Sequence, residues 1–424
     1  MISENKDIFA LPVNKEATIV IIGAGPAGLA ASIQLSKQRI HHFVLDKAVF
    51  PRDKICGDAL SGKVVQAIKG LNEQWLSDLS MSEDFIGSYG VRFVAPNGIP
   101  LDIPFKTNLD DLKQPPGFIA KRFDFDYWLF QKAQSPYATI LSGAKVDSLT
   151  REDTYVRVVF TVDGNAQSLT SKLIIGAEGD RSIVAKSFSE IKKENDHYCA
   201  GIRAYYTGVT GLHEKNFIEL HFIDELLPGY LWIFPMANGG ANVGVGMLSS
   251  VISKKKINLR GVMDHIIKHH PEISKRFKHA ALSDEMRGWG LPLGSKKRKI
   301  SGDNFLLAGD AASLIDPFTG EGIGNAMISG IIAGRKVATA IEAGRLDGVF
   351  LKGYDEEVYR QLWDELKLSR TMQQLTRYPW LFNFVVSKAS KNKLLQETIT
   401  GMFEDMELRS RLKKPGFYFQ LLFK

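Results

Sequence analysis

The stretch ATIVIIGAGPAGL, residues 17–29, decides the fold of this chain. An apolar run rich in Ile and Val reaches Gly23, Gly25 and Gly28 and continues into a helical pattern. This order is typical of a buried parallel strand that turns tightly into a helix. In that setting Gly23 permits the turn, Gly25 lets the backbone approach a pyrophosphate, and Gly28 lets helix and strand pack closely. The free N–H groups at the helix start then face an anion.

A second apolar strand is expected at residues 42–46, HFVLD, and it ends in an acidic residue. Asp46 follows Gly28 by roughly 20 residues, the spacing at which the ribose of a dinucleotide finds a hydrogen-bond acceptor. Glycines alone would also fit a structural turn without a ligand. The strand, turn, helix, second strand and terminal acid together predict a dinucleotide-binding unit.

Length and composition predict a large globular protein. The chain has 424 residues, of which 44% are hydrophobic and 24% charged, enough for a core that splits into two or three lobes. The longest uncharged run, which begins at Ala17, is interrupted by the glycine turn and is a poor transmembrane helix. The N-terminal residues lack the pattern of a secretory signal, and Cys56 and Cys199 are too few for a disulfide framework. These features favour a cytoplasmic location.

The excess of basic residues leaves several partners open. The net charge is +7, with basic runs at residues 254–256 and 296–299 that would attract an anionic substrate, a membrane surface or nucleic acid. No zinc-finger spacing or RNA-binding aromatic motif accompanies them, so nucleic acid is disfavoured. His265, His269 and His270 invite a metal interpretation, but no further ligand set completes a site. We therefore expect a solvated helix there and no metal.

Two segments after the first unit carry candidate functional groups. The loop PRDKICGD, residues 51–58, precedes a helical pattern, so the Cys56 thiol is expected near a helix N-terminus, where it would be more acidic than usual. The alternative is a small packed residue. Arg122 begins another expected helix, at the end where the dipole disfavours a cation. It is expected to serve an external anion or carboxylate, or else to be solvated at the surface.

The rest of the chain predicts a second sheet and a second cofactor contact. An aromatic-rich, strand-like stretch at residues 198–249 either walls an apolar cavity or forms ordinary core. Buried strands run into GAEGDRS at 176–182 and GDAA at 309–312, and two such junctions suggest an extended cofactor contacted at both ends. Further strands are expected at 89–95 and 98–103 and in a meander over 138–169, a helix from the glycine loop to about 343, and amphipathic helices beyond 351.

Four motifs in order resemble the FAD-containing aromatic-hydroxylase superfamily: GAGPAG, Arg122 in KRFDFD, GAEGDRS and GDAASLIDPFTGEGIGNAM. The loop PRDKICGD, the segment PGYLWIFP and the NVGVG that follows it are similar to the geranylgeranyl reductase family. The resemblance implies a mixed α/β fold with a Rossmann-like FAD-binding lobe, a second lobe with a mixed or antiparallel sheet, and a helical C-terminal region. The predicted FAD lobe comprises residues 1–80, 118–190 and 295–345, the substrate lobe 81–117 and 191–294, and the C-terminal region 346–424.

The glycine turns and the resemblance together assign a set of residues to FAD. These are Gly23, Ala24, Gly25, Pro26, Ala27, Gly28, Asp46, Lys47, Arg52, Cys56, Gly57, Arg122, the backbone of Val146, Glu178, Gly179, Gly309, Asp310, Pro317, Gly322, Ile323 and Gly324. Two positions depart from the family pattern. Glu178 stands where an Asp is usual, and Asp58 replaces a second glycine of the cysteine loop, which would narrow the space near the flavin.

The resemblance implies an FAD-dependent oxidoreductase that saturates carbon–carbon double bonds of an isoprenoid or isoprenoid-bearing lipid by hydride transfer from reduced flavin. Cys56 is the first candidate for proton delivery or substrate positioning and Tyr230 the second, while the strand of Tyr230 and Trp232 lines a lipid-sized cavity. NAD(P)H or a redox protein is the expected electron donor. The alternatives are a monooxygenase or halogenase acting on an aromatic or other apolar small molecule, and a lipid carrier that has lost its flavin.

The aromatic and basic tail, residues 412–424, gives a separate expectation about membranes. Aromatic and basic side chains suit a bilayer interface, so peripheral membrane contact is one hypothesis. Docking of the tail on the protein's own surface is the other.

Overall fold

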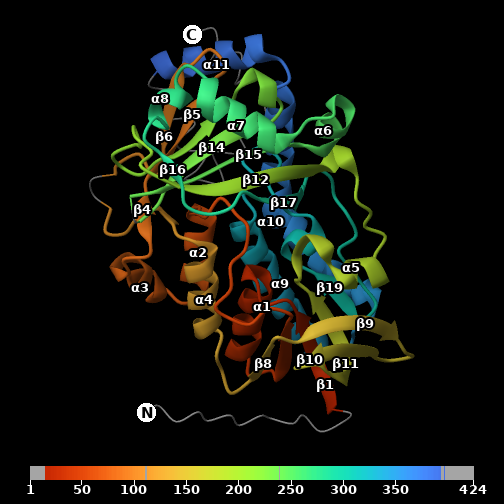
Figure 1. Ribbon diagram of the computed structural model, residues 1–424. Coiled ribbons are helices and arrows are strands. Elements are labelled where there is room, and N and C mark those ends of the chain that lie inside the picture. The colour runs from red at the N-terminus through yellow and green to blue at the C-terminus, as the bar shows by residue number, and fades with distance from the viewer. Residues whose placement is uncertain (1–14, 110–111, 238, 393–395, 397–424) are drawn as a thin grey trace.

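The computed structural model describes residues 15–109, 112–237, 239–392 and 396. These residues form two eight-stranded sheets and a small sheet of three strands. Figure 1 shows β1 and its neighbours at one end of the molecule and the sheet around β12 toward the other, with α1 and α9 between them. The predicted mixed α/β fold with a helical C-terminal region is confirmed. The predicted domain boundaries remain a proposal.

The first sheet is built around β1 (Lys15–Ile22). It lies between β11 (Asn165–Gly176) and β2 (His42–Asp46), and both pairings are parallel. Val20 and Ile21 point to opposite faces and both are fully buried, which explains the unbroken apolar run in the sequence. The sheet also contains β8 (Ala138–Ser142), β9 (Lys145–Arg151), β10 (Val156–Val162), β18 (Ser301–Gly302) and β19 (Phe305–Leu307).

The expected meander is correct only in its later part. Strands β9, β10 and β11 pair antiparallel in sequence order. Strand β8, by contrast, pairs in parallel with β2 at the edge of the central sheet. Its sequence alternation does not distinguish these two arrangements, because an edge strand of either kind is half-buried.

Helix α1 (Pro26–Lys37) packs closely on α9 (Ile323–Glu342) through small residues. A Cβ at Gly330 would lie 2.1 Å from the carbonyl oxygen of Ala27, and one at Gly334 would lie 2.9 Å from the Gln34 side chain. The backbones therefore approach to a distance that only glycine allows. This contact holds the N-terminal glycine turn beside the glycine loop that precedes α9.

The second sheet is mostly antiparallel, with strand order β16-β12-β15-β14-β13-β5-β6 and β17 beside β12. Its one parallel pairing among the described residues joins β13 to β5. The strands are β5 (Gly90–Val94), β6 (Pro100–Pro104), β12 (Tyr198–Thr207), β13 (Ile218–His221), β14 (Tyr230–Pro235), β15 (Ala241–Leu248), β16 (Ala281–Leu282) and β17 (Arg287–Pro292). A third, small sheet contains β3 (Ala59–Leu60), β7 (Gly117–Ile119) and β4 (Ile86–Ser88), with β7 in the middle.

Among the other helices, α2, α4, α7, α8, α10 and α11 fall in segments where helices were expected, whereas the short helices α3, α5 and α6 were not predicted. Figure 1 shows α11 at the far end of the molecule from β1, beyond the second sheet. The predicted membrane tail, residues 412–424, lies outside the described residues. The helices are α2 (Gly62–Leu71), α3 (Trp75–Met81), α4 (Arg122–Lys132), α5 (Ile183–Phe188), α6 (Ser249–Lys255), α7 (Leu259–His269), α8 (Ile273–Arg276), α10 (Gly348–Leu375) and α11 (Pro379–Lys391).

Candidate active site

The glycine turn lies at the carboxyl end of β1. Gly23 has a φ of 100°, and a Cβ there would lie 2.5 Å from the carbonyl oxygen of Ala177, so only glycine fits. A Cβ at Gly28 would lie 1.8 Å from the Gly23 carbonyl oxygen. At Gly25 the nearest atom would be Nη2 of Arg52, 3.9 Å away, and α1 begins there without a side-chain cap. The turn therefore offers open backbone N–H groups with a guanidinium nearby.

Asp46, at the end of β2, already binds this turn. Its Oδ2 accepts the N–H of Ala24 at 2.6 Å, and its Oδ1 accepts the N–H of Ala48 at 2.8 Å. A carboxylate has about four acceptor positions, so capacity remains for a ribose hydroxyl. That contact stays a prediction, as do those of the exposed Lys47 and the half-buried Val146 in β9.

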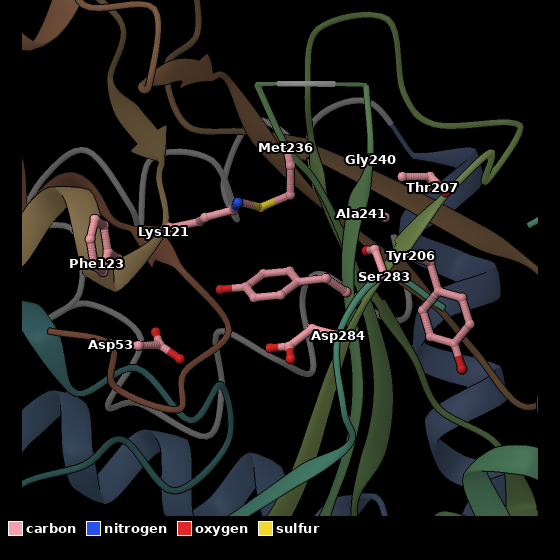
Figure 2. Close-up of a pocket in the computed structure, with 11 residues that line it drawn as sticks. Asp53, Lys121, Phe123, Tyr206, Thr207, Met236, Gly240, Ala241, Ser283 and Asp284 are labelled. Carbon is pink, nitrogen blue, oxygen red and sulfur yellow. The ribbon is translucent and has the colours of Figure 1, made fainter. Parts of the chain in front are cut away.

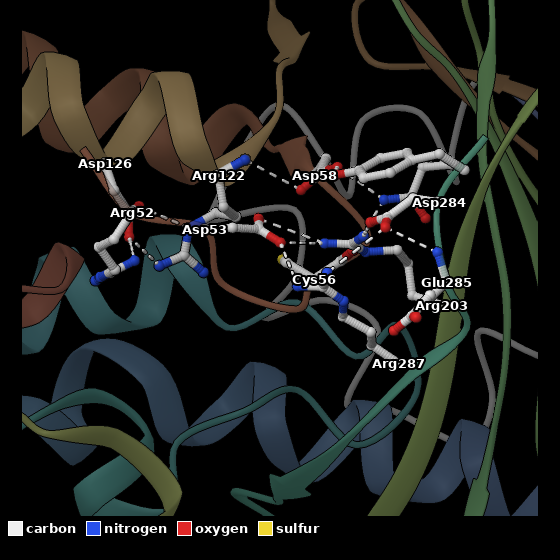
Figure 3. A network of polar contacts seen from close by, with 12 residues as sticks. Arg52, Asp53, Cys56, Asp58, Arg122, Asp126, Arg203, Asp284, Glu285 and Arg287 are labelled. Atoms are coloured by element: carbon white, nitrogen blue, oxygen red, sulfur yellow. Dashed lines mark hydrogen bonds and ion pairs between the residues drawn. The ribbon is translucent and has the colours of Figure 1, made fainter. Parts of the chain in front are cut away.

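Two arginines meet one buried carboxylate next to the cysteine loop (Figure 3). Arg122 Nε and Nη2 donate to Asp126 at 2.6 and 2.7 Å, and Arg52 forms an ion pair with the same carboxylate. Although burial raises the pKa of Asp126, the two guanidiniums outweigh it and hold that pKa below its ordinary value. The surface alternative for Arg122 is wrong, because its side chain is buried and pairs with a carboxylate one turn further along α4. Its expected contact with FAD stays a prediction.

The indole of Trp232 lies against glycines of three segments. A Cβ at Gly244 would lie 2.1 Å from the Trp232 ring, and those at Gly201 and Gly246 would each lie 3.7 Å from it. A Cβ at Gly57 would lie 2.9 Å from the Phe234 ring and 3.8 Å from Trp232 Nε1. The cysteine loop and the aromatic strand β14 are therefore in direct contact, as the prediction of a shared site requires.

A buried set of hydrogen bonds, which we call the Asn242 cluster, fixes this contact. It consists of Asn242, Trp232, Asp58, Tyr205 and the carbonyl of Cys56. Trp232 Nε1 donates to Asn242 Oδ1 at 2.9 Å, while Asn242 Nδ2 donates at 2.8 Å to both the Cys56 carbonyl oxygen and Asp58 Oδ2. The Tyr205 hydroxyl donates to Asp58 Oδ2 at 2.6 Å. One amide thereby joins the cysteine loop to two strands of the second sheet.

Asp58 occupies a backbone position suited to glycine. Its φ is 68°, in the left-handed region, so the family's glycine at this place has a conformational reason. The side chain is fully buried and its carboxylate points into the Asn242 cluster. Burial raises the pKa of Asp58 to about 6, against the opposing hydrogen bonds from Tyr205 and Asn242.

The Cys56 thiol does not stand at a helix N-terminus, so that expectation is wrong. Strand β3 intervenes between Cys56 and α2, and the N-cap of α2 is Ser61, whose Oγ accepts the N–H of Lys63. The loop bends back to pair β3 with β7 instead of entering the helix directly. Cys56 is half-buried and lies beside the guanidinium of Arg122.

A cavity of about 360 Å³ lies beside the Asn242 cluster (Figure 2). Asp53 and Lys121 border it from the first-lobe side, and Met236 and Asp284 border it from the second sheet. The fully buried Arg203 pairs with Asp53 and Asp284 behind it (Figure 3). The residues that line this cavity do not include Tyr230 or Trp232. The lipid cavity expected along the strand of these two residues therefore stays a prediction.

Tyr230 reaches the glycine loop before α9. Its hydroxyl donates to the carbonyl oxygen of Thr319, and burial raises the pKa of Tyr230 well above its ordinary value. Asp316 holds the same loop through the N–H groups of Phe318 and Thr319. Helix α9 then begins at its N-cap Gly322 without a side-chain cap, so its first N–H groups are free to face a ligand.

The structure also places the remaining predicted residues. Glu178 directs its Oε1 to the N–H of Val184 in α5, and burial raises the pKa of its carboxyl group. It therefore stabilises a neighbouring helix start. Gly179 and Gly309 have φ values of 82° and 61° at two adjoining turns. Ile323 and Gly324 form the first turn of α9, Pro317 precedes it, and Asp310 lies in the turn after β19.

Comparisons with known proteins decide the family. Residues 16–367 match the model of a family described as "FAD binding domain". The chain belongs to this FAD-binding family. It is 28% identical to a digeranylgeranylglycerophospholipid reductase of Methanococcus vannielii, over 84% of this chain and 87% of the relative. It is 29% identical to a menaquinone reductase of Mycobacterium tuberculosis, over 76% and 77%.

Solved structures share the fold of this FAD-binding protein. A geranylgeranyl bacteriochlorophyll reductase-like protein from Thermoplasma acidophilum has a TM-score of 0.77 at 20% identity, with 89% of this chain and 92% of that chain covered. A flavin-dependent brominase has a TM-score of 0.72 at 21% identity, with 94% and 99% covered. The predicted resemblance to geranylgeranyl reductases is confirmed, and the protein is an FAD-dependent oxidoreductase.

The geometry of the site fits FAD. The open face at Gly25 with Arg52 nearby suits a pyrophosphate, and the spare acceptor capacity of Asp46 suits a ribose. The uncapped start of α9 at Gly322 suits a flavin carbonyl. Close packing of α1 on α9 brings these two uncapped helix starts into one region.

Several groups of this site were not found from the sequence. Asn242 and Tyr205 stand on β15 and β12, far from Asp58 along the chain, so their pairing leaves no local pattern. Asp126 had a detectable signal, since its spacing from Arg122 places both on one face of a helix. Lys54 Nζ lies 4.5 Å from the Trp289 ring centre, and burial lowers the pKa of its ammonium group.

The described ranges contain neither a cluster of metal-ligating side chains nor a membrane-spanning helix. No group of three His, Cys, Asp or Glu side chains there has the arrangement of a metal site. The rings of His265 and His269 stack on the exposed side of α7. No helix in the described part of the chain is both long and apolar enough to cross a membrane.

Proposed function

We propose that this oxidoreductase reduces carbon–carbon double bonds of an isoprenoid or isoprenoid-bearing lipid. The contact between Gly57 and the Phe234 and Trp232 rings carries the proposal, because it sets an apolar wall against the cysteine loop. The indole N–H of Trp232 is bonded to Asn242, which leaves the ring faces as apolar surface. Relatives named for reducing a digeranylgeranyl lipid and menaquinone support the same substrate class.

FAD, when bound and reduced, supplies the hydride. The chain's residues hold and orient the reactants. Asn242 fixes the plane of the Trp232 indole and the position of the Cys56 carbonyl, so the spacing between wall and loop is set before substrate enters. An apolar wall of this kind also keeps water from the reacting carbons.

The second hydrogen of the product arrives as a proton, for which the chain offers two candidates. Cys56 remains the first, because its half-buried thiol lies in the loop that faces Trp232. Tyr230 is the second. Burial raises the pKa of its hydroxyl, which makes it a weaker acid, and the hydroxyl already donates to the Thr319 carbonyl oxygen, so it ranks after Cys56.

The electron donor and location complete the proposal. NAD(P)H or a redox protein reduces the flavin, and the lipid substrate brings the protein to the periphery of a membrane from the cytoplasmic side. A polyprenyl quinone side chain is a further substrate of the same chemical class. The menaquinone reductase relatives support it.

Anaerobic spectroscopy tests the proposal. The holoenzyme is reduced with dithionite, freed of excess reductant, and mixed with a geranylgeranyl lipid or with its fully saturated analogue. We expect the oxidised-flavin absorbance to return with the unsaturated lipid only. No return with any polyprenyl lipid, together with substrate-dependent oxygen consumption in air, would favour the monooxygenase or halogenase alternative.

A further inference from the structure

Helix α11 has one buried and one exposed apolar face. Phe382 and Val386 are buried against the second lobe. On the opposite side Trp380 is 70% exposed and Phe384 40% exposed, and Tyr378 just before the helix is also exposed. The helix thus presents large aromatic side chains to solvent, while a different set of its apolar side chains packs into the core.

The chain segment that carries this face has charged residues of one sign only. From residue 366 through residue 392 the chain has no Asp or Glu. Four basic side chains of this stretch are exposed, and Lys388 Nζ lies 5.8 Å from the Phe384 ring centre. They are Lys367, Arg377, Lys388 and Lys391. In the whole chain basic residues exceed acidic ones only by 54 to 47, so a stretch of this length with basic residues alone departs from the average composition.

The buried face of α11 is continuous with the aromatic strand of the site. The rings of Phe382 and Phe222 are 4.7 Å apart, and those of Phe222 and Tyr230 are 5.6 Å apart. Two ring contacts therefore connect the helix to β14. Figure 1 shows α11 at the end of the molecule, beyond the second sheet and away from β1.

We propose that the exposed face of α11 docks on an anionic lipid bilayer. Trp and Tyr side chains favour the membrane–water interface, and basic side chains beside them are attracted to anionic headgroups. This inference rests on the proposed function for its purpose: the docked helix places the second lobe, with its aromatic cluster, next to the lipid that is to be reduced.

Vesicle co-sedimentation of the full-length holoenzyme tests the docking. The Trp380→Ser/Phe384→Ser variant is compared with Met81→Ser/Val349→Ser, which removes two apolar side chains that are 77% and 80% exposed elsewhere. On phosphatidylglycerol-rich vesicles we expect about a tenfold lower partition coefficient for the α11 variant and no change for the control. On pure phosphatidylcholine vesicles both should bind weakly.

Equal pelleting of the α11 variant and the wild type on phosphatidylglycerol-rich vesicles would overturn the proposal. So would wild-type binding to pure phosphatidylcholine vesicles that is as strong as its binding to phosphatidylglycerol-rich ones. A dimer that the α11 substitutions dissociate, without vesicle binding by the wild type, would assign the face to a second copy instead. Turnover of a detergent-solubilised isoprenoid by the α11 variant should equal that of the wild type. Absence of turnover by the wild type as well as by the variants, with vesicle binding as predicted, would refute the proposed reaction and leave the docking surface intact.

Discussion

The glycine turn and the Asn242 cluster are two ways of building a site. In the turn, a few consecutive residues create both the fold and the ligand contact: Gly23 and Gly28 exist because a Cβ would collide with backbone. In the Asn242 cluster, the groups come from the cysteine loop and from three strands of the second sheet, β12, β14 and β15, and are brought together by tertiary structure. The turn is formed by residues that are neighbours in the sequence, whereas the cluster joins residues that only the tertiary structure brings together.

The difference implies different costs of mutation. Damage to the turn should prevent the first lobe from forming, because β1 is the centre of its sheet. Damage to the cluster should leave both lobes folded but weaken their contact. The following variants separate these outcomes.

The largest effect is expected from Gly28→Val, matched with Gly25→Ala. At Gly28 a Cβ has no space, so we expect a loss of more than about 4 kcal/mol in the free energy of unfolding, or no folded protein. At Gly25 a Cβ is tolerated, so apoprotein stability should change by less than about 1 kcal/mol while FAD affinity falls. Thermal unfolding of the apoproteins and FAD titration measure the two. Equal destabilisation by both changes would show that the glycines have no separate roles.

The next effect is expected from Asn242→Leu. It leaves Trp232 Nε1 and the Cys56 carbonyl without their buried partner, which should cost about 2–4 kcal/mol of unfolding free energy. Trp232→Phe removes only one donor and should cost less. Denaturant unfolding with tryptophan and circular-dichroism signals measures both. A cost below that of Trp232→Phe would show that Asn242 does not join the segments.

Asp58→Asn tests the cluster through pH. The pKa of Asp58 is about 6 in the folded protein against an ordinary value of 3.8, so the stability present at low pH is lost as pH rises from about 4 through 6. That loss amounts to about 3 kcal/mol for this group. Stability curves of wild type and variant from pH 4 to 7 should therefore diverge in this window, the variant losing less. Parallel curves would contradict a buried, neutral-favouring Asp58.

The smallest effect is expected from Asp46→Ala. Loss of a ribose acceptor should weaken FAD binding by about 1–3 kcal/mol. Because Asp46 also binds the N–H of Ala24, a modest fall in apoprotein melting temperature should accompany it. Isothermal titration with FAD checks the first effect. Unchanged affinity would remove Asp46 from the ribose site.

The sequence was sufficient for the parts of the site that lie at strand ends. The order of strand, glycines, helix and acid predicted β1, α1 and β2, because parallel strands and their turns have local patterns. The same reasoning misplaced Cys56 relative to α2, since a two-residue strand such as β3 carries no periodic signal. It left open whether Arg122 is solvated or faces a carboxylate, because the burial of its partner Asp126 depends on tertiary packing.

The Asn242 cluster lay beyond sequence reasoning for a physical reason. Asn242 and Asp58 are separated by 184 positions, and a buried amide has the same local sequence context as an exposed one. Asp58 was recognisable as unusual, because it stands where the resembling family has a glycine. Its side chain, however, points into the cluster and bonds to Tyr205, a direction that no pattern of a single segment specifies.

Mass spectrometry of the products tests the central claim most directly. The dithionite-reduced holoenzyme is incubated anaerobically with isoprenoid lipids, including polyprenyl quinones. The molecular masses of the extracted lipids are then measured. We predict products heavier by two hydrogens for each double bond reduced. Products that gain oxygen or halogen only after air is admitted, with no anaerobic saturation of any lipid, would contradict it.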